Sequence, residues 1–270
     1  MLLQPTLLSI AGSDPSGGAG IQADLKTMTA IGVYGAAAIT CLTVQNSRGV
    51  QQIKPLTGDF VQAQIRAVLD DHNVTHIKIG MTGSHEIIEC LSQIFHSFSG
   101  EIIYDPVLAS TTGDPLLTTD TFFTLNQKLL PVVSYLTPNT SELQLLSNGA
   151  IVTKADALNC ASSLLKKYPS MKAIIVKGGH LDESDKHISD FLVQPDDIIF
   201  ESKRKRLINP NLHGTGCTYS SAFASYLYLG NELVKAFKMA GEYMNTIIQA
   251  GSKKSVSRNY SNGPLLHFLT

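Results

Sequence analysis

Short apolar segments alternate with amphipathic segments along most of the chain, and this alternation limits the possible folds more than any other feature. Apolar runs of strand length occupy residues 7–12, 35–44, 102–104 and 173–177. Segments with helical spacing lie between them. Strands that alternate with helices in this way form a parallel sheet covered on both faces. We therefore predict an α/β fold with a mainly parallel central sheet and helices on both faces.

The other predicted elements fit the same pattern and leave no boundary between domains. Further strands are predicted over residues 76–81, 135–139, 188–193 and 198–202, and the last two form an antiparallel edge. Helices are predicted over residues 21–28, 59–71, 84–97, 155–167 and 232–250. Three more helices are predicted: one before residue 135, one from about residue 141 and one from Gly214. The chain has 270 residues, of which 43% are hydrophobic, which is enough for one large core. We predict one domain over residues 1–270, with a polar, loosely held tail over about residues 251–270.

Charge and cysteine usage exclude several classes of protein. The formal net charge is −1, which gives no electrostatic basis for binding nucleic acid or an anionic membrane. The basic run over residues 203–206 is interpreted as a solvated strand end, with a phosphate-facing flap as the alternative. The four cysteines are widely spaced and lack zinc-binding patterns, and no apolar run reaches the ~20 residues of a membrane span. We expect a soluble, cytoplasmic protein with reduced thiols.

Two common nucleotide-binding motifs are absent. Gly18, Gly20 and Ala23 match a loose dinucleotide fingerprint, but that fold needs an acidic residue about 20 positions later to hold a ribose. The chain has no Asp or Glu between Leu25 and Gly58. The Gly-x-x-x-x-Gly-Lys-Ser/Thr loop of P-loop proteins is also missing.

A late stretch, Asn209-Pro210-Asn211-Leu212-His213-Gly214-Thr215-Gly216-Cys217-Thr218, is typical of a functional helix start. A helix that begins at Gly214, Thr215 and Gly216 directs unpaired N–H groups and the positive end of its dipole at one point, which suits an anion. Cys217 would lie in the first turn, where this field lowers the pKa of a thiol and favours a base or a nucleophile. The alternative is a tight turn followed by an inert core cysteine.

Polar residues follow several of the predicted strands, and the carboxyl ends of parallel strands share one edge of a sheet. They are Gln45, Asp105, Asn139, Glu142 and Lys177. Each alone is typical of a turn or a strand end. Together with the helix start, two carboxylates could hold Mg²⁺ through water, a lysine could pair with phosphate, and the helix amides could take the charge of a transferred phosphoryl group. This combination indicates an ATP-dependent kinase in which Cys217 accepts the proton of the acceptor hydroxyl.

The chain resembles the hydroxymethylpyrimidine/phosphomethylpyrimidine kinases of thiamine synthesis, within the ribokinase-like vitamin kinases. The resemblance covers nearly the whole chain. Its motifs are Ala11-Gly12-Ser13-Asp14-Pro15-Ser16-Gly17-Gly18-Ala19-Gly20-Ile21-Gln22-Ala23-Asp24, Val44-Gln45-Asn46, Lys78-Ile79-Gly80-Met81, Asp105-Pro106-Val107, Thr137-Pro138-Asn139-x-x-Glu142, Val176-Lys177-Gly178-Gly179-His180 and His213-Gly214-Thr215-Gly216-Cys217-Thr218. It implies a three-layer ribokinase-like fold, a homodimer, and phosphorylation of the pyrimidine alcohol and then of its monophosphate.

The resemblance also implies a role for individual residues. The residues that would border the pyrimidine are Gly12, Asp24, Gln45, Met81 and Val107. Those that would face Mg-ATP are Asp105, Asn139, Glu142 and Lys177. Cys217 would be the base, beside the anion site of Gly214, Thr215 and Gly216. Thr82 and Leu212 depart from the residues that are more usual in the family, which affects loop detail only. A pyridoxal/pyridoxine kinase of the same superfamily and a catalytically silent vitamin-binding regulator are the alternatives.

Overall fold

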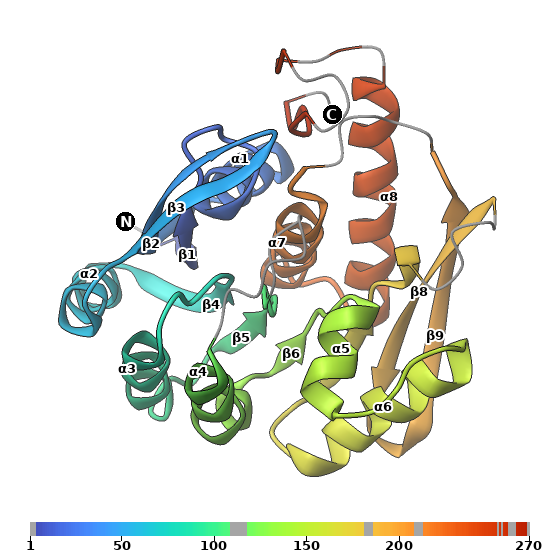
Figure 1. Cartoon of the computed structure of the whole chain (residues 1–270), viewed down its shortest axis with the longest axis horizontal. Coiled ribbons are helices and arrows are strands. Elements are labelled where there is room, and N and C mark those ends of the chain that lie inside the picture. Colours follow the sequence, from blue (N-terminus) through green and yellow to red (C-terminus); the bar gives the residue numbers. More distant parts are fainter. Residues whose placement is uncertain are drawn as a thin grey trace.

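A computed structural model describes residues 4–108, 118–180, 186–207, 213–252, 254, 256–258 and 263–268. Within these residues, nine strands form one sheet in the order β3-β2-β1-β4-β5-β6-β7-β8-β9 (Figure 1). The strands are β1 (Pro5–Ser13), β2 (Gly35–Asn46), β3 (Gly49–Pro55), β4 (Asn73–Ile79), β5 (Glu101–Tyr104), β6 (Tyr135–Leu136), β7 (Ala173–Val176), β8 (His187–Gln194) and β9 (Ile198–Lys205).

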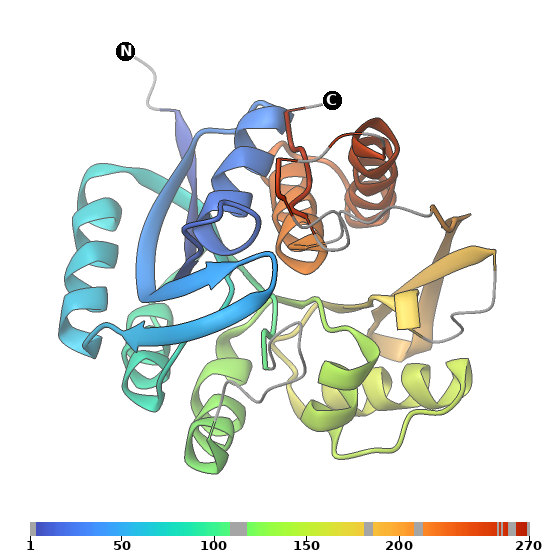
Figure 2. The same cartoon turned by 45° about the horizontal axis from the view of Figure 1, so that its top comes forward.

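The centre of the sheet is parallel, as predicted. Strands β2, β1, β4, β5, β6 and β7 pair in parallel, whereas β3 joins one edge and β8 and β9 the other in antiparallel register. Figure 2 shows β2 and β3 as one long ribbon at the margin of the sheet. Strand β3 is not among the predicted elements, because its sequence, Gly-Val-Gln-Gln-Ile-Lys-Pro, is mostly polar and most of its side chains are exposed.

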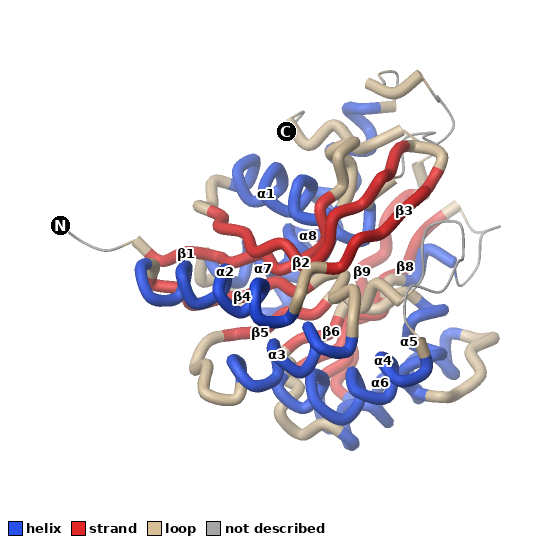
Figure 3. The backbone as a smooth tube through the Cα atoms, turned by 60° about the vertical axis from the view of Figure 1, so that its left-hand side comes forward, coloured by secondary structure: helices blue, strands red, loops and turns tan. Residues whose placement is uncertain are grey.

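Helices cover both faces of the sheet, which confirms the three-layer prediction (Figure 3). The bounds of the helices are α1 (Gly20–Ile31), α2 (Gly58–Asp71), α3 (His85–Phe95), α4 (Thr119–Thr124), α5 (Thr140–Ser147), α6 (Lys154–Lys167), α7 (Thr215–Tyr228) and α8 (Leu233–Gly251), with the short segments η1 (Leu125–Leu129), η2 (Leu130–Val132), η3 (Gly178–His180) and η4 (Pro195–Asp197). The largest cluster of buried side chains joins the sheet to α2, α3, α5, α6 and η1, and a second cluster joins the other face to α1, α7 and α8.

The period of two along β1 explains how one strand serves both clusters. Leu8 and Ile10 belong to the first cluster, whereas Leu7, directly before Leu8, belongs to the second. Successive side chains of a strand point to opposite faces, so an apolar run without alternation marks a strand that is buried on both sides. The short apolar runs that the sequence analysis singled out are therefore the central strands.

The basic run over residues 203–206 is only partly solvated, so the prediction of a solvated strand end is wrong for its arginines. The Arg204 guanidinium forms an ion pair with the buried carboxylate of Asp190, and Arg206 donates a hydrogen bond to the Gly179 carbonyl, at 3.1 Å. Lys203 and Lys205 are exposed. The alternation along β9 thus directs the arginines inward and the lysines outward. In the part of the chain that the structure describes, no helix is long and apolar enough to cross a membrane.

Candidate active site

The predicted site residues lie at the carboxyl edge of the parallel strands. Strands β2 and β3 lie on one side of β1, and β4 and all later strands lie on its other side. The strand order therefore reverses at β1. Ligands of open α/β sheets bind outside the carboxyl ends of the strands at such a reversal. The side chains that reach this edge follow β1, β2, β4, β5, β6 and β7, and the amino end of α7 joins them.

Helix α7 begins with an open first turn. Its N-cap, Gly214, has φ 85° and makes no side-chain cap, and the first helical bond of the segment runs from the Thr218 amide to the Gly214 carbonyl. A Cβ atom on Gly214 would stand 1.7 Å from the carbonyl oxygen of Gly18, so only glycine fits here. Because the first helical bond starts at Thr218, the amides of residues 215–217 lack helical partners, and their binding of an anion stays a prediction.

A buried ion pair lies against this helix start. The Lys177 ammonium donates a hydrogen bond to Asp105 Oδ1 at 2.7 Å, and the Thr137 hydroxyl donates to the same oxygen at 3.1 Å. A Cβ atom added to Gly216 would be 3.4 Å from Lys177 Nζ and 3.7 Å from Asp105 Oδ2. Burial opposes the ionisation of Asp105, but the ammonium groups of Lys177 and Lys78 outweigh it and hold the pKa of Asp105 below its usual value. The anion-binding amides and a charged Lys–Asp pair therefore share one space.

Asn139 and Glu142 form a capping box at the start of α5. The Asn139 side chain accepts from the Glu142 amide at 2.9 Å, and Glu142 Oε2 accepts from the Asn139 amide at 2.7 Å. Lys177 Nζ lies 3.9 Å from Glu142 Oε2, so one ammonium reaches two carboxylates. Burial raises the pKa of Glu142 to about 7, against the attraction of Lys177. The predicted facing of Asn139 and Glu142 towards Mg-ATP stays a prediction, and the capping box shows that both residues also shape the backbone.

The residues near Lys177 suit a magnesium ion bound largely through water. Asp105 Oδ2 is buried and has no hydrogen-bond partner among the described residues, and such an oxygen awaits a donor or a cation. Mg²⁺ prefers carboxylate oxygens and keeps several waters, so it does not need a full protein cage. The structure shows no cluster of three or more potential ligands within its described part. Asp105 and Glu142 are the residues that would hold the ion.

Cys217 lies in the first turn of α7, but its pKa differs from the predicted one. Burial raises the pKa of the thiol to about 11, the Lys78 ammonium and the Gly20 amide oppose this shift, and the carboxylates of Asp24 and Asp105 add to it. The prediction of a lowered pKa is therefore wrong. The helix start alone suggests a stabilised thiolate, but the sequence does not show that the thiol is desolvated and has two buried carboxylates nearby.

A second ion pair, between Lys78 and Asp24, lies within the fold. Both side chains are 0% exposed, and Lys78 Nζ is 2.9 Å from each carboxylate oxygen of Asp24. Ser9 and Ser221 each donate a hydrogen bond of 2.6 Å to the same carboxylate. Since Ser221 lies about one helical turn after Cys217, this cluster fixes α7 against the sheet. The proposed contact of Asp24 with the pyrimidine is untested, and any influence of its carboxylate must act through neighbouring groups.

Two of the residues predicted to border the pyrimidine, Gly12 in β1 and Met81 after β4, lie close together. A Cβ atom on Gly12 would lie 2.8 Å from Cys41 Sγ and 3.6 Å from Met81 Sδ, so the backbone of β1 approaches these side chains closely. Val107 lies two residues beyond Asp105, and its amide donates to the Asp105 carbonyl at 2.9 Å. Because they follow β1, β4 and β5, which are neighbours in the sheet, these residues can form one wall.

Gln45 lies farther along the same edge, at the end of β2. Its amide nitrogen is 3.2 Å from Nε2 of His213, the residue that precedes the N-cap of α7. His213 Nε2 is also 3.1 Å from the carboxylate of Asp14. That carboxylate accepts the amides of Gly18 and Ala19 and therefore closes the glycine-rich loop after β1. Asp14 and His213 both lie inside the sequence motifs but are not among the predicted site residues.

The last described residues contact the same region, so the prediction of a loosely held tail is wrong for them. Leu265 and Leu266 are each 4% exposed and His267 is 2% exposed. The His213 amide donates to the Gly263 carbonyl at 3.2 Å, and the Thr218 hydroxyl is 2.9 Å from His267 Nε2. A short apolar run, Pro-Leu-Leu-His-Phe, ends the polar stretch and is the signal that could have indicated this docking.

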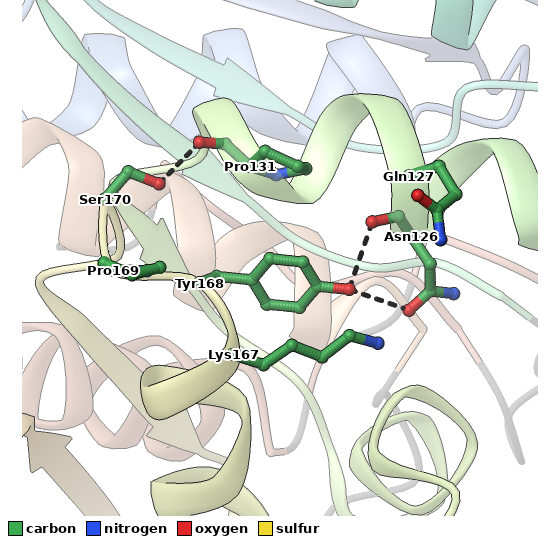
Figure 4. Close-up of a pocket in the computed structure, with 7 residues that line it drawn as sticks. All are labelled: Asn126, Gln127, Pro131, Lys167, Tyr168, Pro169 and Ser170. Atoms are coloured by element: carbon green, nitrogen blue, oxygen red, sulfur yellow. Dashed lines mark hydrogen bonds between the residues drawn. The ribbon is translucent and has the colours of Figure 1, made fainter.

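A shallow depression elsewhere on the surface does not belong to the site (Figure 4). It lies before the amino ends of β6 and β7, whereas the site lies at their carboxyl ends. Its polar groups bond to one another: Tyr168 donates to the Asn126 carbonyl at 3.1 Å, and Ser170 donates to the Pro131 carbonyl at 2.5 Å. No buried charge is directed into it among the residues that line it, which are Asn126, Gln127, Pro131, Lys167, Tyr168, Pro169 and Ser170.

Known proteins resemble this chain over nearly its whole length. A family model described as phosphomethylpyrimidine kinase matches residues 14–265. A hydroxymethylpyrimidine/phosphomethylpyrimidine kinase of Rhizobium meliloti is 38% identical over 262 residues, which cover 97% of this chain and 96% of that protein. The corresponding enzyme of Escherichia coli is 35% identical over 268 residues, with coverages of 97% and 96%.

Solved structures agree with the sequence relatives. A phosphomethylpyrimidine kinase of Clostridium difficile has a TM-score of 0.78 and 35% identity, and the match covers 90% of this chain and 98% of that one. A pyridoxal kinase of Staphylococcus aureus in complex with ADP has a TM-score of 0.86 and 27% identity, with coverages of 100% and 95%. The fold is thus the ribokinase-like fold of the vitamin kinases, and the chain belongs to the phosphomethylpyrimidine kinase family.

Proposed function

We propose that this enzyme transfers the γ-phosphoryl group of ATP to the hydroxymethyl group of 4-amino-5-hydroxymethyl-2-methylpyrimidine and then to the monophosphate so formed. The observation that supports this most is the contact of the open first turn of α7 with the pair of Asp105 and Lys177. Phosphoryl transfer needs positioning and stabilisation of charge more than covalent chemistry, and this contact supplies both. The names of the sequence relatives support the choice of substrate.

The residues of the open edge divide into those that hold the phosphates and those that bind the acceptor. We assign Asp105, Asn139, Glu142 and Lys177 to Mg-ATP, with Asp105 and Glu142 as the residues that would hold Mg²⁺, and we assign Gly12, Gln45, Met81 and Val107, with Asp24 behind them, to the pyrimidine. When bound, the ion would neutralise phosphate charge. The amides of Gly214, Thr215, Gly216 and Cys217 stabilise the charge of the transferred group, and the Cys217 thiolate accepts the proton of the hydroxyl.

The second phosphorylation has an anion as its acceptor. A helix amino end tolerates added negative charge, because its free amides and dipole favour anions. Lys177 supplies a further cation, which the carboxylates of Asp105 and Glu142 hold at this edge. The same site can therefore accept the alcohol and its monophosphate in turn.

Pyridoxal is the alternative acceptor, and the high TM-score with a pyridoxal kinase favours testing it. The test is a side-by-side kinase assay with the pyrimidine alcohol, its monophosphate and pyridoxal. We expect turnover of both pyrimidines and diphosphate as the final product. Monophosphate as the sole product, with the monophosphate inert as a substrate, would refute the second step. A preference for pyridoxal would establish the alternative, and ATP turnover with none of the three would favour a silent vitamin-binding regulator.

The continuous sheet supports one domain over residues 1–270, and an apolar strand face supports a homodimer. On β2, Leu42 and Val44 point to the same face and are 46% and 50% exposed. Exposed neighbouring apolar side chains are typical of an interface between subunits. A mass of twice the monomer by light scattering, reduced in a Leu42→Glu, Val44→Glu variant, would support this proposal. The near-neutral net charge and the free thiols support a soluble, cytoplasmic enzyme that binds neither nucleic acid nor membranes.

A further inference from the structure

Side chains from three segments meet at the imidazole of His213, which is 3% exposed. Its Nε2 lies 3.1 Å from Asp14 Oδ2 and 3.2 Å from the amide nitrogen of Gln45. The other end of the Gln45 amide lies 3.2 Å from Thr43 Oγ1, which is itself 2.9 Å from the carbonyl oxygen of Ser13. The two ends of the glutamine amide are therefore both in contact with the protein.

The position of one proton follows from the contacts of Asp14. Its carboxylate accepts hydrogen bonds from Ser16, Gly18 and Ala19, so it serves as an acceptor throughout. Although burial opposes this, the hydrogen bonds from His213 and Ser16 lower the pKa of Asp14 to about 2. An ionised carboxylate can only accept, so the hydrogen between the two groups belongs to His213 Nε2. This holds whether the ring is neutral or protonated.

The orientation of the Gln45 amide follows from that proton. An Nε2–H group cannot accept a hydrogen bond, so it must face the amide oxygen and not the amide nitrogen. A half-turn of the amide about its last bond exchanges these atoms without moving any other group. The amide nitrogen then donates to Thr43 Oγ1, whose own hydrogen goes to the Ser13 carbonyl at the shorter distance of 2.9 Å. In this arrangement the Gln45 oxygen shares the single Nε2 hydrogen of His213 with Asp14, and the amide nitrogen donates to Thr43 Oγ1.

We propose that Asp14 and His213 are positioning residues that determine substrate specificity, because they lock the Gln45 amide with its oxygen towards His213 and its nitrogen towards Thr43. This inference rests on the proposed contact between Gln45 and the pyrimidine. Each end of the amide keeps one further hydrogen-bonding position, a donor on nitrogen and an acceptor on oxygen. The lock fixes the order of that donor and acceptor along the edge that faces the ring.

A fixed order distinguishes two closely related heterocycles. The 4-aminopyrimidine offers a ring nitrogen that accepts and an exocyclic amino group that donates, which complements the amide. Its 4-oxo analogue offers a ring N–H and a carbonyl oxygen, the reverse pattern. A freely rotating glutamine could turn to match either ring, whereas a locked one leaves both positions of the oxo analogue mismatched. A site built to bind one polar group rejects an analogue without it strongly, by up to about 10⁴-fold.

The test measures kcat/KM for the 4-amino alcohol and for its 4-oxo analogue and takes their ratio. We expect the wild-type ratio to be about 10² or more, and to fall by about tenfold in His213→Phe and by a few-fold in Thr43→Val. His76→Phe is the control, because His76 lies towards the amino end of β4, away from the carboxyl ends of the strands, and should leave the ratio unchanged. Loss of activity towards both substrates by the same factor in the first two variants would overturn the lock.

A spectroscopic measurement on the wild-type enzyme keeps the inference testable if His213→Phe does not fold. Long-range ¹H–¹⁵N correlation spectra show which imidazole nitrogen carries hydrogen. We expect a hydrogen on Nε2 of His213, and its loss in favour of Nδ1 would overturn the inference. The Gln45→Leu variant distinguishes a failure of the lock from a failure of the proposed contact between Gln45 and the pyrimidine. If it leaves pyrimidine turnover unchanged while Nε2 carries hydrogen, the proposed substrate contact fails and the lock does not set specificity.

Discussion

The enzyme contains two buried Lys–Asp pairs that are alike in chemistry and different in completeness. In the first, which we call the closed pair, Lys78 and Asp24 are both fully buried, and both oxygens of Asp24 accept hydrogen bonds from protein donors. In the second, the open pair, Lys177 is 15% exposed and Asp105 Oδ2 has no partner within the described residues. The closed pair, whose carboxylate oxygens all have protein partners, stabilises the fold. The open pair has a carboxylate oxygen without a partner beside the first turn of α7, so it can still bind a ligand.

Cys217 experiences the charges of both pairs, and its replacement should have the largest effect on rate. We expect Cys217→Ala to lower kcat by about 10²–10⁴-fold, the usual loss of a general base. Burial raises the pKa of the thiol to about 11, so the thiolate is a minor form at neutral pH. The rate should therefore rise with pH above 7 in the wild type and much less in Cys217→Ala. A fully active variant, or a phosphocysteine trapped in a single turnover, would contradict the role of a base.

Removing the lysine from each pair compares the two directly. Lys78→Met leaves the Asp24 carboxyl enclosed without its cation, and breaking a buried pair in this way costs about 3–5 kcal/mol of unfolding free energy. Lys177→Met should cost clearly less, because the Lys177 side chain is partly exposed, but should abolish most activity. Denaturant unfolding measures the first effect, and kcat/KM of the folded enzyme measures the second. Equal losses of stability would show that the division into a closed and an open pair is wrong.

Glu142 makes the open pair sensitive to pH. Burial raises its pKa in the folded enzyme from 4.5 to about 7, so the folded state binds a proton that the unfolded state releases over this range. Its contribution to stability is therefore greatest at low pH and is lost as the pH rises from 4.5 to 7. Glu142→Gln keeps an acceptor for the Asn139 amide and removes this titration.

The measurement is the difference in unfolding free energy between Glu142→Gln and the wild type as a function of pH. It should increase in favour of the variant by at most about 3 kcal/mol between pH 4.5 and 7. The pKa of His267 is lowered to about 4 by burial, which adds the opposite trend below pH 6.5. Taking the difference cancels that contribution. A pH-independent difference would mean that Glu142 is ionised throughout.

Gln45 lies outside both pairs and should give the smallest effect. Replacing it by Leu leaves the polar edge of the pyrimidine unsatisfied, which costs roughly 1–3 kcal/mol. The expected loss in kcat/KM is therefore about tenfold or more for the pyrimidine, with a much smaller change for pyridoxal and an unchanged Mg²⁺ requirement. Equal losses on both acceptors would assign Gln45 a structural role, separate from substrate choice.

The sequence predicts the layers and the shared edge of Asp105 and Lys177 well, because both depend on short-range patterns. Apolar runs mark the central strands, and the polar residues directly after them mark the edge where Asp105 and Lys177 meet. The closed pair is harder to predict, because Asp24 lies in a helix and Lys78 inside a strand, so neither directly follows an apolar run and only the fold joins them. A lysine inside the apolar run of β4 is the available signal, because a buried ammonium requires a partner.

Other features depend on the tertiary environment and not on local sequence. The pKa of Cys217 is set by burial and by two carboxylates from α1 and β5, so the helix start alone predicts the wrong direction. Strand β3 is polar because it lies at an exposed edge. The docking of Leu265 and His267 depends on the surface that α7 offers. These contributions come from long-range contacts, which a pattern in one segment does not contain.

The central claim is that the open pair is the phosphoryl-transfer centre, and the same chemical change in each pair tests it most directly. The measurement is the Mg²⁺ concentration for half-maximal rate, at saturating ATP and pyrimidine, in Asp105→Asn and in Asp24→Asn. We predict that Asp105→Asn stays folded, needs much more Mg²⁺ and turns over slowly. Asp24→Asn should lower the melting temperature while its folded fraction keeps the wild-type Mg²⁺ requirement. An unchanged Mg²⁺ requirement in Asp105→Asn would contradict the claim.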